Sequence, residues 1–240
     1  MNKIYSVYTT MNLSRIKKYS RAKFGELDIN FYFAEKISKL IYKNVLSKKK
    51  KCVIYFTKRE PRISIYTNNS EILAKMVSKI LKLPCIIGKY KRRYNKKHFY
   101  DNQIKRKSIA TTRINAEIKE KYKNYTVIMV DDSILTGTVF KASLNALKST
   151  TKDVYLFTIA NLKDCKFSEK EVNNFYYSLK GIDYLIFLLN LKKPIISGQL
   201  LRTIDDLNNT EVKRLLKNIP VTESSLLKKA FKHYIGRKLN

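Results

Sequence analysis

The stretch that decides the fold is YTVIMVDDSILTGTVF, residues 125–140. It begins with an apolar, β-branched run at residues 126–130, continues with the adjacent carboxylates Asp131 and Asp132, and ends in a Thr-Gly-Thr turn. A short apolar run of this kind is typical of a buried strand in a parallel sheet. We therefore expect a strand at residues 126–130, a loop that begins at Asp131 and a helix that begins near Val139.

The segments around this stretch alternate between strand and helix patterns. Three more short apolar runs predict buried strands: residues 52–56, 85–87 and 154–160. Residues 31–46 and 68–83 have the apolar spacing of amphipathic helices, and Asn68 followed by Glu71 is a capping-box pattern. Such alternation at short spacing indicates an α/β fold with a central, mainly parallel sheet flanked by helices.

The pattern changes near residue 165 and becomes mostly helical. Residues 209–219 and 223–235 have helical spacing, with Pro220 between them. Residues 182–191 are the most apolar run, too short to span a bilayer and therefore predicted to be a buried helix or strand. The expected organisation has three parts: a basic N-terminal arm at 1–19, an α/β domain at 20–165 and a helical C-terminal extension at 166–240.

The charge balance is strongly basic. The chain has 50 Lys and Arg against 19 Asp and Glu, a formal net charge of +31. Exchange of Arg for Lys in an AT-rich genome would leave the net charge unchanged, so the shortage of carboxylates needs its own explanation. A field this positive attracts polyanions such as nucleic acid, anionic membranes or phosphorylated metabolites. The alternative is a solvated basic surface without a dedicated partner.

The cysteines and histidines do not form a recognisable framework. Cys52, Cys85 and Cys165 are far apart, odd in number and without a CxxC motif, so we expect neither disulfides nor a zinc site. His98 and His233 are isolated and more typical of solvated surface positions than of metal ligands. No N-terminal segment has the features of a signal peptide, and the expected location is a reducing compartment, the cytoplasm.

The Asp-Asp loop has the composition of a site for phosphate and sugar. Ligands of parallel α/β sheets bind beyond the carboxyl ends of the strands, where loop amides and a helix N-terminus can bind phosphate. Gly137 would allow close approach of the backbone, and Ser133, Thr136 and Thr138 would add hydroxyl donors. Because two carboxylates repel phosphate, they should face sugar hydroxyls or Mg²⁺. The alternative is that they only cap the next helix, which one Asp already does.

These residues resemble a known family. VIMVDDSILTGTVFKASLNAL, residues 127–147, resembles the motif with which type I phosphoribosyltransferases bind phosphoribosyl pyrophosphate (PRPP), and VDDSI looks like the glutamine amidophosphoribosyltransferase version. NNSEILAKMVSKILKLP at 68–84 and KFGELD at 23–28 look like the ComF-like, competence-associated branch. Gln103, Arg113 and Asn115 occupy places similar to those of ComF-like proteins. The resemblance covers about residues 20–165.

The resemblance implies a role for each matching residue. Asp131 and Asp132 would be the catalytic pair that holds the ribose hydroxyls of PRPP. The remaining roles would be divided among three groups: Ser133, Ile134, Leu135, Thr136, Gly137 and Thr138 for the 5-phosphate, Thr57, Lys58 and Arg59 for pyrophosphate, and a flexible loop at 88–108 containing Lys91, Arg92, Arg93 and Gln103. The flexible loop would close over the site and exclude water. Mg²⁺ would be the cofactor, held through PRPP without a direct protein ligand.

The resemblance also implies an activity. The expected function is Mg²⁺-dependent transfer of a phosphoribosyl group to an unidentified acceptor, with release of pyrophosphate, in nucleotide metabolism. A homodimer is a further expectation, and no transmembrane segment is expected. A second hypothesis is a catalytically reduced protein of the same fold that binds nucleic acid or a ribonucleoprotein through its basic surface. The net charge favours it, as do the apolar Leu135 and Val139, where the family usually has hydroxyls. A third hypothesis is a regulator that senses PRPP.

Two basic segments could contact other partners. The mixture of aromatic and basic residues at 89–100 could stack on single-stranded nucleic acid, or it could serve as the basic cover of the site. Residues 225–238 form a basic amphipathic pattern that could meet a membrane or nucleic acid. The alternative for 225–238 is that Leu226, Leu227, Phe231 and Tyr234 pack on their own domain.

Overall fold

A computed structural model describes residues 3–59, 67–91, 113–115, 122–135, 137–147, 151 and 153–239. The chain divides into two compact units. The sheet unit consists of Met1–Met11, Phe31–Arg62 and Ser70–Lys166, and the helical unit of Asn12–Asn30, Ile63–Asn69 and Phe167–Asn240. In the part of the chain that is described, no helix is long and apolar enough to cross a membrane.

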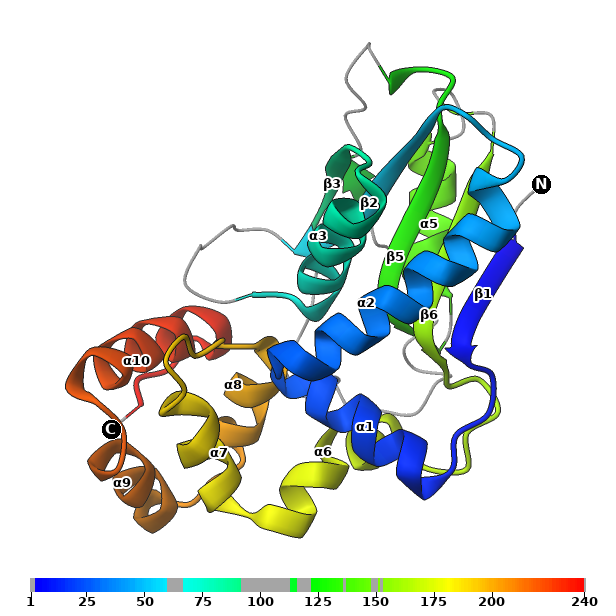
Figure 1. Cartoon of the computed structure of the whole chain (residues 1–240). Helices are drawn as coiled ribbons and strands as arrows, with labels where there is room; N and C mark the ends of the chain where they lie inside the picture. Colours follow the sequence, from blue (N-terminus) through cyan, green and yellow to red (C-terminus); the bar gives the residue numbers. More distant parts are fainter. Residues whose placement is uncertain are drawn as a thin grey trace. The chain divides into compact units, whose positions relative to one another are not determined.

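The sheet unit is built on a mainly parallel sheet (Figure 1). Its strands are β1 (Lys3–Tyr8), β2 (Cys52–Arg59), β3 (Cys85–Lys91), β4 (Arg113–Asn115), β5 (Thr126–Ile134) and β6 (Val154–Asn161). They lie in the order β1-β6-β5-β2-β3-β4, and each neighbouring pair is parallel except for the antiparallel pair β3 and β4. This topology confirms the predicted α/β class with its mainly parallel sheet.

Helices cover both faces of the sheet. Figure 1 shows α2 (Leu27–Ile41) and α3 (Asn69–Leu81) on one face and α5 (Thr138–Leu147) on the other. Val127 and Met129 of β5 pack with Phe140 of α5, while the intervening Ile128, pointing the opposite way, is also fully buried. Burial on both faces explains why the strand is a continuous apolar run rather than an alternating one.

The N-terminal residues do not form the expected arm. Residues 3–8 are β1, which pairs parallel to β6 at the edge of the sheet. Tyr5 stacks on Phe157 with 5.0 Å between the ring centroids, and the hydroxyls of Ser6 and Thr158 are 2.7 Å apart. The arm was predicted because the segment is polar and basic, whereas its backbone pairs with a strand about 150 residues away, and Tyr8 also packs edge-on against Phe33 of α2.

Gly88 of β3 is required by the packing of the sheet. A Cβ at this position would lie 1.9 Å from Oη and 2.5 Å from Cζ of Tyr55, whose side chain in β2 is fully buried. Because the interior is close-packed, neither the ring nor the strand has room to move. We expect Gly88→Ala to lower the free energy of unfolding by about 3 kcal/mol, the upper part of the range for overpacking.

Urea denaturation of Gly88→Ala in two backgrounds checks this prediction. In the Tyr55→Leu background the ring is gone, so the same substitution should cost much less than in the wild type. An equal loss of stability in both backgrounds would show that the contact with Tyr55 is not the cause.

The helical unit has its own core. It consists of α1 (Leu13–Phe24), α6 (Glu169–Lys180), α7 (Ile182–Leu189), α8 (Gly198–Asp205), α9 (Asn209–Lys217) and α10 (Val221–Ile235), with the first residues of α2. The apolar run at 182–191 is therefore a helix, α7, and the C-terminal part is helical as predicted. Leu227 and Phe231 of α10 are buried in this core, whereas Leu226 is 46% exposed.

The helical unit also takes in segments from outside residues 166–240. Asn12 caps α1, and Ile16, Tyr19 and Phe24 of that helix are buried. Thr67 donates its backbone N–H to the carbonyl of Ile196 at 2.9 Å. The sequence places these segments before the C-terminal part, so only their packing shows that they belong with it.

Candidate functional site

Strand β5 continues through the two aspartates. It pairs with β6 at Asp131 opposite Thr158, Ser133 opposite Ala160 and Ile134 opposite Asn161. The loop predicted to begin at Asp131 therefore begins only at Leu135, and α5 begins at Thr138. The prediction was wrong because it ended the strand where the side chains become polar, whereas the backbone hydrogen bonds to β6 continue.

The sheet changes its pairing beside Asp131. β5 pairs with β2 only as far as Met129 opposite Tyr55. Beyond that point β5 continues along β6, and β2 continues along β3 as far as Arg59. The helix after β2 (α3) and the helix after β5 (α5) lie on opposite faces (Figure 1). This is a topological switch point, the position at which open α/β sheets bind their ligands.

Asp131 is held from two sides. Its Oδ1 accepts a hydrogen bond from Ser70 Oγ at 2.5 Å and another from the backbone N–H of Asp132 at 2.8 Å. Ser70 belongs to the first turn of α3 and is buried, and Asp131 is half-buried. Asp132 Oδ1 accepts from Ser133 Oγ at 3.3 Å. Ser70 was not predicted as a site residue, because its position in a capping pattern gives no sign of contact with a residue 61 positions away.

Lys58, predicted to meet pyrophosphate, forms an ion pair. Its Nζ lies 2.7 Å from Glu71 Oε2, and the two side chains are only 13% and 11% exposed. Glu71 Oε1 also accepts from Lys75 Nζ at 2.7 Å. Burial raises the pKa of Glu71, but the hydrogen bonds from Lys58 and Lys75 outweigh it, so that this pKa lies below its usual range. An anionic ligand at Lys58 would therefore compete with Glu71.

The ion pair makes part of the stability pH-dependent. The pKa of Glu71 is lower in the folded state than in the unfolded state. The ionised side chain therefore stabilises the fold above its unfolded pKa of about 4.3, and this stabilisation is lost as the pH falls through the folded pKa. We expect Glu71→Gln to lower the free energy of unfolding by about 1.5–3 kcal/mol at pH 7, as for hydrogen bonds to charged groups. The difference from the wild type should shrink towards zero as the pH falls below about 4.3.

Denaturation curves of both proteins between about pH 3 and pH 7, a range that includes the unfolded pKa of about 4.3, test this expectation. Lys75→Gln serves as the control, since the side chain of Lys75 is 60% exposed and its loss should cost less than about 0.5 kcal/mol. If the free energies of unfolding of Glu71→Gln and the wild type differ by a constant amount over this pH range, the lowered pKa of Glu71 is contradicted.

The turn after β5 ends in a glycine with a left-handed backbone. Gly137 has φ +69°, and a Cβ there would meet only Ile134 Cδ1 at 3.7 Å, so the requirement for glycine is conformational. Its carbonyl accepts the first hydrogen bond of α5, from Lys141 N–H at 2.9 Å. The first amides of a helix lie outside its own hydrogen-bond ladder and carry the positive end of its dipole. Thr136 and the side chain of Thr138 lie outside the described part of the chain.

The remaining predicted residues are only partly described. Thr57 is buried at the end of β2, and the side chain of Arg59 is not described. Lys91 is the last residue of β3 and lies opposite Arg113 of β4, while Asn115 lies opposite Lys89. Residues 88–91, predicted to begin the flexible loop, are instead the end of β3, because their backbone pairs with β2 and β4. Arg92, Arg93, Gln103 and His98 lie outside the described residues, so the rest of the predicted flexible loop stays a prediction.

The described side chains do not form a metal cage. In those parts of the chain, no group of three or more His, Cys, Asp and Glu could hold a metal ion. Cys52, Cys85 and Cys165 are free, and burial raises the pKa values of Cys52 and Cys85 to about 11. These two thiols are therefore protonated at neutral pH and are poor nucleophiles.

Comparison with known proteins gives structural neighbours only. No protein-family model matches the chain, and no curated protein matches it. A purine phosphoribosyltransferase from Pyrococcus horikoshii is 15% identical, with a TM-score of 0.36 over 68% of this chain and 95% of that one. A hypoxanthine-guanine phosphoribosyltransferase from Bacillus anthracis is 10% identical, with a TM-score of 0.37 over 67% and 79%.

A third neighbour is much longer than the region it shares. Phosphoribosylpyrophosphate synthetase from Mycobacterium smegmatis is 14% identical, with a TM-score of 0.33, and the match covers 54% of this chain but only 33% of the synthetase. Likeness at these identities and TM-scores carries no argument about activity, which must come from the residues themselves.

Proposed function

We propose that this chain is a PRPP-binding protein of the phosphoribosyltransferase type, which transfers a phosphoribosyl group to an acceptor and releases pyrophosphate. The observation that carries the proposal is local. Two carboxylates, a left-handed glycine turn and a helix N-terminus follow one another at the switch point of the sheet. The resemblance to the PRPP motif falls on the same residues, 127–147.

The carboxylates suit the ribose of PRPP. Ionised Asp131 and Asp132 can only accept hydrogen bonds, and sugar hydroxyls donate them. The hydrogen bond from Ser70 holds Oδ1 of Asp131 and thereby orients the carboxylate. In this proposal Ser70 is a positioning residue that acts through Asp131.

The 5-phosphate and the pyrophosphate of PRPP would bind at two different parts of the site. The amides at residues 137–140, at the start of α5, would meet the 5-phosphate. Thr57, Lys58 and Arg59, at the end of β2, would meet the pyrophosphate. Lys58 would leave Glu71 and bind pyrophosphate instead, so that the positive charge of Lys58 becomes available only when a polyanion is present.

Magnesium fits this set of donors. Carboxylate and hydroxyl oxygens of Asp131, Asp132 and Ser133 are the hard ligands that Mg²⁺ prefers, but they are too few to bind it alone. The ion would therefore be held through oxygens of PRPP, without a direct protein ligand. When bound, it supplies positive charge that offsets the charge of pyrophosphate.

The proposed chemistry is a displacement at the anomeric carbon. A bond forms between that carbon and the nucleophilic atom of the acceptor, and the bond from the carbon to the pyrophosphate oxygen breaks. Pyrophosphate keeps the bonding electrons, and the acceptor gives up its proton. Because the transition state resembles an oxocarbenium ion, the protein contributes mainly by positioning the reactants and stabilising the leaving group.

The finer assignment to the ComF-like branch is part of the proposal. It rests on residues 68–84 and 23–28 of the sequence. Ser70, which contacts Asp131, belongs to the first of these segments, so the segment that carries the resemblance also reaches the site.

Calorimetric titration with PRPP in moderate salt tests the function. We expect a dissociation constant between about 1 μM and 1 mM, the usual range for enzyme substrates, and a requirement for Mg²⁺. Pyrophosphate serves as a control polyanion, and release of pyrophosphate in the presence of purine and pyrimidine bases tests turnover. Absent binding, or binding indifferent to Mg²⁺, would sink the proposal.

A further inference from the structure

The loops that precede the strands gather at the end of the sheet opposite the candidate site. Because β2, β3, β5 and β6 are parallel, the loops that precede them meet at one end of the sheet, its amino end. β2 has 8 residues, so at about 3.3 Å per residue this end lies about 25 Å from the carboxyl end. Nothing in the proposed PRPP chemistry uses the amino end.

Backbone hydrogen bonds fix these loops beside one another. The carbonyl of Lys51, before β2, accepts from Thr126 N–H at the start of β5 at 2.9 Å. The carbonyl of Asp153, before β6, accepts from Val127 N–H at 2.9 Å, and the carbonyl of Pro84, before β3, accepts from Ile54 N–H at 2.9 Å. The loops therefore form one continuous surface.

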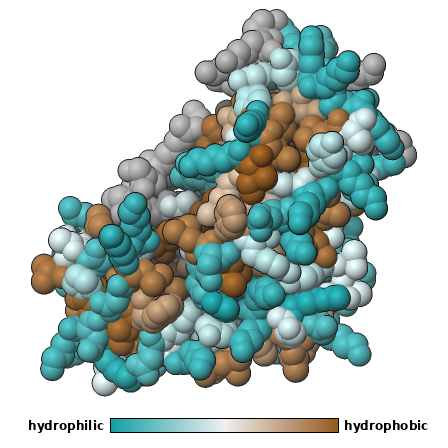
Figure 2. All heavy atoms as spheres, viewed as in Figure 1, coloured by the Kyte–Doolittle hydropathy of each residue, from teal (hydrophilic) through white to brown (hydrophobic). Residues whose placement is uncertain are grey.

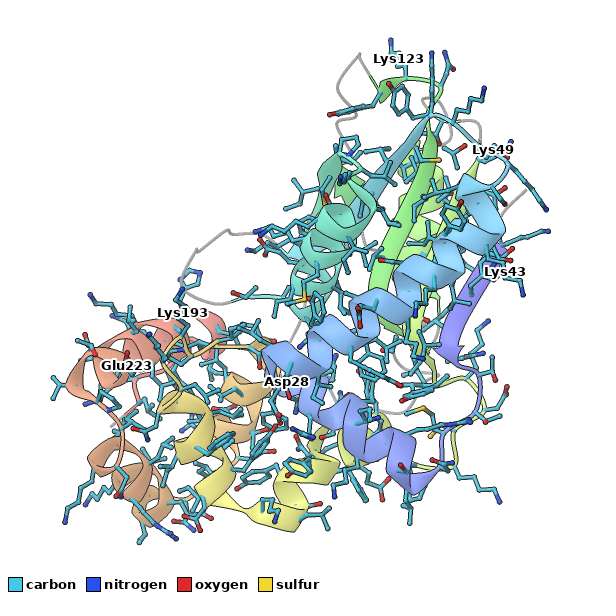
Figure 3. All side chains as sticks on the ribbon, in the orientation of Figure 1. Asp28, Lys43, Lys49, Lys123, Lys193 and Glu223 are labelled. Carbon is cyan, nitrogen blue, oxygen red and sulfur yellow. The ribbon has the colours of Figure 1, made fainter. Side chains whose placement is uncertain are left out.

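This surface is almost entirely basic. Five exposed lysines from three loops make up what we call the amino-end surface: Lys48, Lys50, Lys51, Lys82 and Lys123. In the described residues of these loops (47–51, 82–84, 122–125, 151 and 153), Asp153 is the one carboxylate, and it lies 2.9 Å from Lys49 Nζ. Hydrophilic side chains cover this end in Figure 2, and Figure 3 shows Lys49 and Lys123 pointing outward from it.

The basic charge is concentrated in the sheet unit. This unit holds 32 of the 50 Lys and Arg and 10 of the 19 Asp and Glu, so it carries +22 of the net +31. Of the carboxylates in its described part, Glu71 and Asp153 are already bound to lysines. Among the described residues, these two acids are therefore not available to offset the exposed lysines.

An exposed aromatic residue precedes the lysine run in the chain. Tyr42 is 65% exposed and lies in η1 (Tyr42–Leu46), the turn directly before the lysine run. Its carbonyl accepts from Ser47 N–H at 3.1 Å, which ties it to the first residue of the loop. An exposed ring beside lysines can stack on a nucleobase while the lysines meet the phosphates.

We propose that the amino-end surface, with Tyr42, binds the phosphodiester backbone and a base of single-stranded nucleic acid. Neighbouring strands are about 4.8 Å apart, so the row of lysines from β3 to β5 is about 10 Å wide, which suits an extended polyanion better than a single phosphate. The exposed ring favours an unpaired strand, because a duplex keeps its bases stacked inside. This interaction is independent of the proposed PRPP site.

Fluorescence anisotropy with a labelled oligo(dT) of about 20 nucleotides, enough to exceed a typical single-strand site, tests the proposal on the full chain. The test variant carries Lys48→Gln, Lys50→Gln, Lys51→Gln and Lys123→Gln. The matched control removes the same charge from exposed positions on α9 and α10 of the helical unit: Lys213→Gln, Lys217→Gln, Lys228→Gln and Lys229→Gln. Circular dichroism confirms that each variant is folded.

The expected result is a local effect. At about 0.1 M salt the test variant should bind at least about tenfold more weakly, and the slope of log affinity against log salt should fall by about 0.7 for each phosphate that is no longer neutralised. The control variant should change by less than about threefold. Tyr42→Ala should weaken binding of the single strand about tenfold, because the base can no longer stack on the ring.

Three results would overturn the proposal. Equal losses of affinity in the test and control variants would mean that the total charge, and not this surface, attracts nucleic acid. Equal affinity for inorganic polyphosphate of matched charge would remove the case for a nucleic acid. Unchanged affinity of Tyr42→Ala, together with equal binding of a duplex, would exclude a single strand as the preferred partner.

Discussion

Asp131→Asn together with Asp132→Asn is expected to weaken Mg²⁺-dependent PRPP binding at least about 100-fold. Hydrogen bonds to charged groups are each worth about 1.5–3 kcal/mol, and each carboxylate is proposed to accept at least one from the ribose. The amide side chains have nearly the same size as the carboxylates, and the amide oxygen at position 131 would still accept from Ser70, so the fold should be retained. Calorimetric titration with PRPP measures the effect.

The sign of the charge change makes this result diagnostic. The double variant raises the net charge from +31 to +33, since it removes two negative charges, and this should strengthen any unspecific attraction of PRPP. Weaker binding must therefore come from removal of the carboxylates. Glu35→Gln with Asp164→Asn is the matched control, since both side chains are exposed in the sheet unit and the charge change is the same.

Two measurements of PRPP affinity test whether Asp131 and Asp132 face the ligand. Ser70→Ala should weaken PRPP binding by only about fivefold, because it removes one neutral donor that orients Asp131, worth about 1 kcal/mol. Unchanged PRPP affinity in the double aspartate variant would mean that the two carboxylates do not face the ligand. The proposed function would then fail, whereas the nucleic-acid proposal would be unaffected.

Arg21→Met is expected to lower the free energy of unfolding of the helical unit by about 3 kcal/mol, because it leaves a buried carboxylate without its counter-charge. Glu26 is 5% exposed. Arg21 donates to it from Nε at 3.0 Å and from Nη2 at 2.5 Å, and Tyr184 Oη donates at 2.5 Å. The hydrogen bond to Glu26 is the main reason that the pKa of Arg21 is raised.

A matched exposed pair and a double variant test this explanation. Arg214 pairs with Asp183 at 2.6 Å, but the side chains are 54% and 71% exposed, so Arg214→Met should cost less than about 1 kcal/mol. Adding Glu26→Gln to Arg21→Met removes the unpaired charge and should restore much of the stability. Hydrogen exchange of the amides of α1 and α7 reports on this unit alone. Equal destabilisation by Arg21→Met and Arg214→Met would contradict the role of burial.

Much of the fold follows from local features of the sequence. The apolar runs at 52–56, 85–87, 126–130 and 154–160 each form the first part of a strand, because strand residues buried on both faces of a sheet have to be apolar. The helices at 68–83 and 209–219 were found from spacing and capping signals, which act within a few residues. The Asp-Asp pair and Gly137 were singled out for the same reason, since their chemistry can be recognised without knowing the fold.

The tertiary structure decided everything that depends on distant partners. β1 is a strand only because β6 provides its hydrogen bonds, and β6 also extends β5 through Asp131. Residues 12–30 join the helical unit through packing that no local pattern signals. These contacts join residues far apart in the chain, and a sequence fixes them only through the folded arrangement as a whole.

The same division holds for the two proposed sites. The sequence by itself determined which side chains are candidates for the proposed chemistry: adjacent carboxylates and a glycine turn. Only the tertiary structure decided that Ser70 holds Asp131, that Glu71 holds Lys58, and that the lysine loops share the opposite end of the sheet. The physical reason is that parallel strands bring all their ends together at two edges, whatever the separation of those ends along the chain.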